Sequence, residues 1–237
     1  MMQWWTSDAV RFMRDASEYG DHYARLSNYL MRWLPADGHL CDAGCGLGYL
    51  AQALADHCRY VTAIDRSEAA IAAMRARRLP ENLETICGDA FQLLPERPFD
   101  AMTFCYFGSS EEILRLARRR CNGPVVMVKR DCSEHRFSVH PGRTHRDVRA
   151  AAEDLLERNG IPFHSERLAL EFGQPFRTPE DAMAFFRLYN PQAEVNENWV
   201  AGRLTKTGRT DFPLYLPELR KMAVLVFQSK DIPEELQ

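Results

Sequence analysis

Short apolar runs alternate with helix-like stretches along most of the chain. The apolar runs predict strands at residues 39–42, 60–64, 84–87, 99–106, 124–129, 164–172 and 222–228. Helices are predicted between them at residues 49–57, 68–77, 111–119, 144–158 and 180–189, with Ser67 and Thr178 as N-caps of the second and the last. Strands that alternate with helices in this way are typical of a parallel sheet covered on both faces. The pattern therefore predicts an α/β fold.

A helical extension is predicted before the first strand. Within residues 7–34, aromatic and aliphatic side chains recur at steps of three, four and seven, and the run ends at the turn formed by residues 35–38. These side chains are Phe12, Tyr19, Tyr23, Leu26, Leu30 and Trp33. Such spacing places them on one face of a single helix.

The last part of the chain departs from this regular alternation of strands and helices. The final strand, residues 222–228, is nearly all apolar, which favours a position covered on both faces. The segment before it, about residues 173–221, is too long to be a simple connection and is expected to be a lid on the substrate side. We therefore predict a doubly wound, mostly parallel seven-stranded sheet within a single domain of residues 1–237. Its parts are a helical cap (residues 1–36), a cofactor-binding half (residues 37–130) and a substrate-side half (residues 131–237).

Composition narrows the function classes. The 237 residues are 46% hydrophobic, enough for the core of one large α/β domain, and the formal net charge is −3. Proteins that grip nucleic acid through its phosphates are usually strongly basic, so this balance argues against such a partner. No apolar run has the length needed to cross a bilayer, and the N-terminus lacks a signal-peptide pattern, so a cytoplasmic protein is expected.

A glycine-rich loop follows the first predicted strand and precedes a helix. It reads Asp42-Ala43-Gly44-Cys45-Gly46-Leu47-Gly48. Glycines let the backbone turn tightly and approach a ligand closely, although an ordinary strand–turn–helix connection can also be rich in glycine. Dinucleotide-binding loops carry glycine at the first, third and sixth positions, but the sixth position counted from Gly44 is Tyr49. The acid two residues before the first glycine also differs from that pattern.

The loop resembles the first motif of the class I, Rossmann-like S-adenosylmethionine-dependent methyltransferases. The resemblance implies that Asp42 and the glycine backbone hold the methionine end of the cofactor, whose ammonium group is cationic. It covers residues 38–130 closely and the rest of the chain more loosely. It also implies that the sheet closes with an antiparallel last strand, which residues 222–228 would supply.

Two further acids end the next two strands, at the sheet edge where ligands of doubly wound folds bind. Asp65 is suited to accept hydrogen bonds from both ribose hydroxyls, and the resemblance implies that Asp89 reads the adenine amino group. Phe91 is placed to pack on the purine. Either acid alone could equally be a turn or cap residue. The expected cofactor-binding residues are Asp42, Gly44, Cys45, Gly46, Gly48, Asp65, Arg66, Asp89, Ala90, Phe91 and Cys105.

Catalytic candidates lie after the fourth and fifth strands. Tyr106 follows the fourth strand, where residues of the family normally face the sulfonium. The loop at residues 129–146 carries His135, His140 and His145 among several basic side chains, which suits an anionic acceptor or a proton acceptor. A solvated polar loop is the alternative. Cys132 and the three histidines are possible zinc ligands, but their spacing matches no zinc pattern, so no metal is expected.

Missing signatures restrict the acceptor. The chain lacks the Asn/Asp-Pro-Pro-aromatic motif of enzymes that methylate planar amino groups, and it lacks the Pro-Cys pair of cytosine-C5 enzymes. No acid ends the fourth strand, where catechol-type enzymes hold magnesium. We therefore expect methyl transfer to an O, N, S or C atom of a small molecule by a monomer or homodimer. The alternatives are an S-adenosylmethionine-binding sensor or partner subunit without activity, and an RNA or protein methyltransferase.

Overall fold

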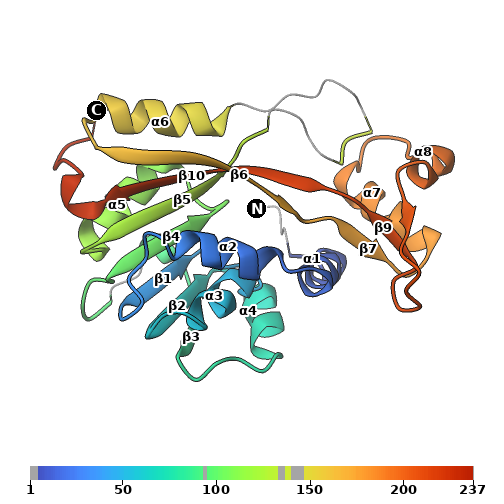
Figure 1. Cartoon of the computed structure of the whole chain (residues 1–237), viewed down its shortest axis with the longest axis horizontal. Helices are drawn as coiled ribbons and strands as arrows, with labels where there is room; N and C mark the ends of the chain where they lie inside the picture. Colours follow the sequence, from blue (N-terminus) through green and yellow to red (C-terminus); the bar gives the residue numbers. More distant parts are fainter. Residues whose placement is uncertain (1–4, 93–94, 133–136, 140–146, 237) are drawn as a thin grey trace. The chain divides into compact units, whose positions relative to one another are not determined.

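The computed structural model describes residues 5–92, 95–132, 137–139 and 147–236 (Figure 1). The chain divides into two compact units. The sheet unit consists of Tyr23–Asp131, Asp147–Leu168 and Lys221–Gln237. The small unit consists of Met1–His22, Cys132–Arg146 and Ala169–Arg220. The predicted partition into cap, cofactor half and substrate-side half stays a prediction.

The large sheet has seven strands in the order β3-β2-β1-β4-β5-β10-β6. The strands are β1 (His39–Ala43), β2 (Tyr60–Asp65), β3 (Leu83–Cys87), β4 (Ala101–Cys105), β5 (Pro124–Arg130), β6 (Phe163–Glu171) and β10 (Leu219–Gln228). Strands β3, β2, β1, β4 and β5 pair in parallel, whereas β10 is antiparallel to β5. Both the doubly wound α/β class and the antiparallel closing strand are thus confirmed.

Helices cover both faces of this sheet. Inward residues of α5 (Ser110–Arg120) and α6 (Val148–Arg158) share one core cluster with alternate residues of the strands, such as Cys41 and Ala43 of β1. Side chains alternate along a strand, so Leu40 and Asp42 point to the opposite face. The helices α2 (His22–Leu30), α3 (Tyr49–Ala55) and α4 (Glu68–Arg75) complete the fold (Figure 1). As predicted, the Ser67 hydroxyl caps α4 by accepting from the Ala70 N–H.

The single N-terminal helix expected over residues 7–34 is wrong. The segment forms two helices, α1 (Ser7–Tyr19) and α2, because Gly20 is extended and interrupts the helical hydrogen bonding. The apolar positions also serve two cores rather than one. Phe12 of α1 belongs to the aromatic cluster of the small unit, whereas Leu26 and Leu30 of α2 are fully buried in the sheet unit.

The small unit is built on aromatic packing. Its core includes Phe12, Phe176, Phe185 and Phe186, which pack edge to face. A three-stranded antiparallel sheet runs in the order β7 (Gln174–Phe176), β9 (Leu214–Leu216) and β8 (Thr205–Lys206), beside α7 (Pro179–Tyr189) and α8 (Glu197–Ala201). These strands were not predicted because two or three residues are too few to show an alternating pattern. The N-cap at Thr178 is confirmed.

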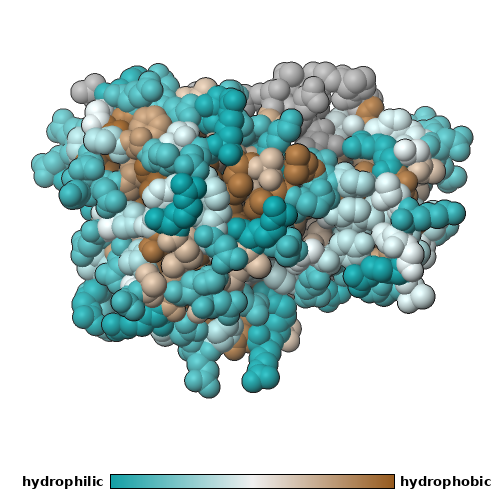
Figure 2. Space-filling view, viewed as in Figure 1, coloured by the Kyte–Doolittle hydropathy of each residue, from teal (hydrophilic) through white to brown (hydrophobic). Residues whose placement is uncertain are grey.

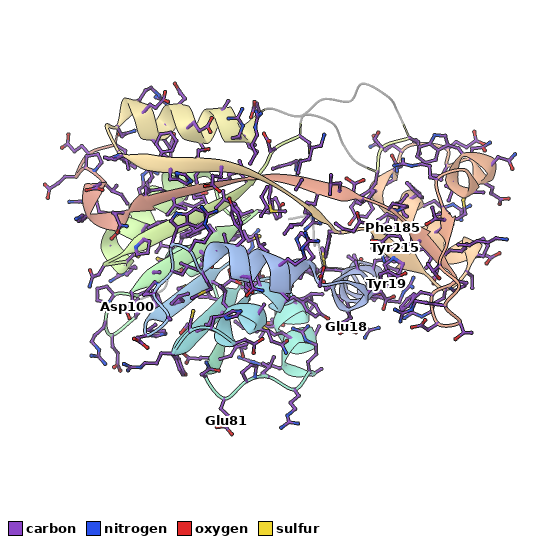
Figure 3. All side chains as sticks on the ribbon, viewed as in Figure 1. Glu18, Tyr19, Glu81, Asp100, Phe185 and Tyr215 are labelled. Carbon is purple, nitrogen blue, oxygen red and sulfur yellow. The ribbon has the colours of Figure 1, made fainter. Side chains whose placement is uncertain are left out.

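Helix α1 is held to the rest of the small unit by an ion pair with a buried carboxylate and by a ring stack. Asp15 is buried and accepts hydrogen bonds from both terminal nitrogens of Arg177. Tyr19 stacks on Tyr215 of β9 with ring centroids 4.9 Å apart. Both residues are labelled in Figure 3. Segments far apart in the sequence are therefore held together by one carboxylate and one aromatic pair.

The surface is what the composition predicts. Hydrophilic residues cover most of the face shown in Figure 2, with apolar residues between them. Within the described part of the chain, every helix is too short or too polar to cross a bilayer.

We expect Asp15→Ala to lower the free energy of unfolding by about 2 kcal/mol, because it removes two hydrogen bonds to a charged partner from a buried position. Urea unfolding followed by far-UV circular dichroism measures this. The control is Asp8→Ala, since Asp8 lies 64% exposed on the same helix and is expected to change stability by less than about 0.5 kcal/mol. Equal stability of the two variants would contradict the role of the Asp15–Arg177 pair.

Candidate functional site

The parallel strands β1, β2 and β3 end at one edge of the large sheet and bring the predicted acids to it. Asp42 lies near the end of β1, and Asp65 ends β2 in register with Cys87, the last residue of β3. Asp89 follows two residues after β3. The carboxyl edge of a doubly wound sheet is where such folds bind ligands. The sequence motif and the sheet topology therefore point to the same place.

The glycine loop is fixed to β2 by hydrogen bonds. The N–H groups of Gly44 and Cys45 both donate to the Ile64 carbonyl, at 2.8 and 3.0 Å. The Gly46 N–H donates to Asp65 Oδ2 at 2.9 Å, and the other oxygen of Asp65 accepts from the Ser67 N–H at 2.9 Å. One carboxylate thus holds both the tip of the loop and the start of α4.

Two of the loop glycines make room for side chains of the protein itself. Gly44, Gly46 and Gly48 all have positive φ, at 72°, 55° and 72°, a region that disfavours residues with a Cβ. A Cβ on Gly44 would lie 2.0 Å from the ring of Phe107, and one on Gly48 would lie 2.1 Å from the sulfur of Met74. The glycine pattern is therefore required by backbone conformation and packing as well as by any ligand.

Asp42 is a buried carboxylate with one oxygen left over. It is 1% exposed, and Oδ1 accepts from the Thr103 hydroxyl at 2.9 Å. Among the described residues, no group makes a hydrogen bond of standard geometry to Oδ2. Burial raises the pKa of Asp42 to about 7, and the Thr103 hydroxyl and the Ala51 N–H offset part of that rise. A buried acceptor without a partner is costly, and a bound cation would relieve that cost.

Two stacked phenylalanines lie where the adenine of the cofactor is expected to bind. The Asp89 carboxylate is exposed and accepts from the Phe91 N–H at 2.9 Å. Phe91 stacks on Phe107 with centroids 5.2 Å apart and planes 11° apart, so Phe107 already covers one face of the ring expected to pack on the purine. Phe107 belongs to the residues after the fourth strand that the family resemblance places near the sulfonium, but its stacking on Phe91 was not predicted from the sequence.

The remaining predicted residues lie around the same edge in different environments. Ala90 is buried in the core, Arg66 is exposed and Cys105 is half-buried. Burial raises the pKa of the Cys45 thiol well above its usual range, so it stays protonated. A reactive thiolate at Cys45 is therefore not a feature of this loop.

Tyr106 has an unusual backbone. Its φ is +56°, a value that is strained for a tyrosine, and its N–H donates to the Val128 carbonyl at 2.9 Å. The side chain is 40% exposed. Strained residues of this kind are concentrated at ligand sites, which is consistent with its place among the catalytic candidates. His135, His140 and His145 lie outside the described residues. Among the residues that the structure describes, no cluster of side chains could hold a metal ion.

Lys129, expected only as one of the basic side chains of the segment at residues 129–146, is buried. It lies near the end of β5, is 7% exposed, and donates from Nζ to the Gly108 carbonyl at 3.0 Å. Burial lowers its pKa to about 8, an effect that the Glu112 carboxylate opposes. The signal available in the sequence was a lysine at the end of an otherwise apolar strand.

Comparison with known proteins supports the reading of this edge. Residues 40–122, which contain the glycine loop and all three acids, match the family described as Methyltransferase domain. The predicted resemblance to methyltransferases is thereby confirmed over residues 40–122, and members of that family use S-adenosylmethionine. No curated protein is detectably similar to the chain in sequence.

Solved structures share the fold at low sequence identity. A candidate methyltransferase of an antibiotic biosynthesis pathway from Anabaena variabilis has a TM-score of 0.58 at 15% identity, covering 86% of this chain and 96% of that one. Precorrin 8W decarboxylase from Methanobacterium thermoautotrophicum has a TM-score of 0.54 at 17% identity, covering 86% and 89%. A candidate methyltransferase from Bacillus halodurans has a TM-score of 0.53 at 15% identity, covering 89% and 99%.

We expect Gly44→Ala to destabilise the protein by about 2 kcal/mol more than Gly160→Ala, because of overpacking against Phe107. Gly160 is the matched control, since its φ is +63° but no atom lies within 4 Å of the added Cβ. Urea unfolding of the two variants gives the difference. A Gly44→Ala variant no less stable than Gly160→Ala would show that Phe107 does not pack against the loop.

Proposed function

We propose that this chain, whose residues 40–122 match the methyltransferase-domain family, binds S-adenosylmethionine at the carboxyl edge of the sheet and transfers its methyl group to a small-molecule acceptor. The observation that carries the proposal is Asp42, a buried carboxylate whose Oδ2 has no standard hydrogen bond within the described residues. It lies next to a loop with three glycines in the left-handed region.

The residues present fit this cofactor. Asp42 can accept from the ammonium of the methionine part, which would give the leftover oxygen a charged partner. Asp65 keeps lone pairs for ribose hydroxyls beyond the two backbone N–H groups that it already accepts. Asp89 is exposed and so available to the adenine amino group. We assign Gly44, Cys45, Gly46, Gly48, Arg66, Ala90, Phe91 and Cys105 to the surrounding wall.

When bound, S-adenosylmethionine supplies a methyl group on a positively charged sulfur, which is already activated for in-line displacement. The protein then has to align the acceptor and, for an alcohol or ammonium acceptor, remove a proton. Tyr106 and the histidines His135, His140 and His145 are the proposed groups for this step. The basic residues of the loop at 129–146 favour an acceptor that carries negative charge.

The charge distribution favours a small molecule over RNA. The densest basic cluster lies on α5, and its members Arg115 and Arg118 already pair with Glu111 and Glu234. These pairings reduce the basic surface that α5 could offer a phosphate backbone, and the net charge of −3 also argues against such a partner. Salt-dependent retention on immobilised RNA would reverse this preference.

Calorimetry with S-adenosylmethionine and S-adenosylhomocysteine tests the cofactor, and release of S-adenosylhomocysteine in the presence of candidate acceptors tests the reaction. Binding without turnover against a broad set of acceptors would favour the alternative of a sensor or partner subunit. Absence of binding for both compounds would refute the proposed function.

Binding of S-adenosylmethionine is expected to strengthen by about tenfold as the pH rises from about 5.5 to 7 and to level off above about pH 8, because the pKa of Asp42 is raised to about 7 and only the carboxylate attracts the cation. Asp42→Asn should bind more weakly and without this dependence. The control is Asp56→Asn, an exposed carboxylate at the end of α3 that should keep the wild-type profile. Calorimetric titrations at several pH values measure the effect, and an unchanged profile in Asp42→Asn would exclude Asp42 from the site.

A further inference from the structure

Lys129 is a charged residue in a buried position near the end of the apolar strand β5. Strands β4 and β5 pair in parallel with Cys105 opposite Val128, so Lys129 lies just beyond the end of β4. Its side chain is buried and projects from the same face of the sheet as that of Met127, two residues earlier, and Ala223 of β10 lies opposite it in the ladder. Burying an ammonium group costs desolvation free energy, which hydrogen bonds or an ion pair must offset.

The ammonium of Lys129 is directed at the loop between β4 and α5. It donates to the Gly108 carbonyl at 3.0 Å, two residues after the strained Tyr106. The start of α5 is fixed separately by a capping box, in which Ser109 and Glu112 bond to one another. The lysine therefore restrains the part of the loop that the helix cap leaves free, and this part contains Phe107.

Phe107 connects the loop between β4 and α5 to the glycine loop. Its ring fills the space beside Gly44 that a Cβ would occupy, and it stacks on Phe91. The ring of Phe91 in turn lies against Gly108, with its Cζ 2.9 Å from the position of a Cβ there. Phe107 is thus packed between Gly44 and Phe91, and the carbonyl that follows it is held by Lys129.

We infer that Lys129 is a positioning residue of the cofactor site, which holds the Gly108 carbonyl and thereby keeps Phe107 packed against Gly44. The inference rests on the proposed function. A loop with three left-handed glycines has much conformational freedom, and a ring packed against its first glycine reduces the number of conformations that must be excluded when a ligand binds.

The test compares S-adenosylhomocysteine affinity in wild type, Lys129→Met, Phe107→Ala and the double variant. We expect Lys129→Met to weaken binding by up to about tenfold, because a loop that is no longer restrained has to be ordered when the ligand binds. Because the lysine acts through the ring, the double variant should bind no more weakly than Phe107→Ala alone. Lys221→Met removes an exposed lysine of β10 and should leave the affinity unchanged.

Each outcome has a distinct meaning. Wild type that fails to bind S-adenosylhomocysteine refutes the proposed function, whereas wild type that binds with Lys129→Met unchanged refutes only this inference. Additive losses in the double variant would also refute it, since they would show that Lys129 does not act through Phe107. The melting temperature of each variant shows whether it is folded.

A wild-type measurement covers the case in which Lys129→Met does not fold. Amide hydrogen exchange of the peptide spanning Tyr106 to Gly108 is expected to slow when S-adenosylhomocysteine binds, because the two loops are in contact through Phe107. Unchanged exchange in that peptide, with slower exchange in the glycine loop, would overturn the inference.

Discussion

The carboxylate of Asp65 is the constraint on which the candidate site depends. It accepts one backbone N–H from the glycine loop and another from the start of α4, so two connections of the sheet take their shape from a single side chain. The three glycines of the loop contribute no side chains, so its shape depends on these hydrogen bonds and on Phe107 and Met74, which pack against Gly44 and Gly48. Hydrogen bonds from Gly44 and Cys45 to Ile64 complete the attachment to β2. What a ligand would meet at this edge is therefore decided by the end of the second strand as much as by the motif itself.

The layout of the large sheet was accessible from the sequence because it depends on regular features. Apolar runs separated by helical stretches locate the strands, and the acids at or just after the ends of the first three strands show which edge carries the chemistry. The predicted bounds differ from those observed by a few residues at most places, as expected where helix ends fray. The antiparallel position of β10 followed from the family resemblance rather than from its apolar composition.

Other features could not be read from the pattern, for identifiable reasons. The N-terminal apolar positions follow a helical period through Gly20, so periodicity alone does not show that Phe12 and Leu26 belong to different cores. The short strands of the small unit are too brief to alternate visibly. The roles proposed for Lys129 and Phe107 depend on the groups that surround them in three dimensions. The local sequence around either residue does not indicate those neighbours.

The packing of Phe107 and Met74 against Gly44 and Gly48 has a consequence for transplanting the motif. The glycine loop packs closely against two residues that are distant in the sequence. One of them follows the fourth strand, and the other lies in the helix after the second strand. Moving the loop alone into a related protein would leave gaps or collisions wherever those two positions carry side chains of another size. The transferable unit is the loop together with both of its distant partners.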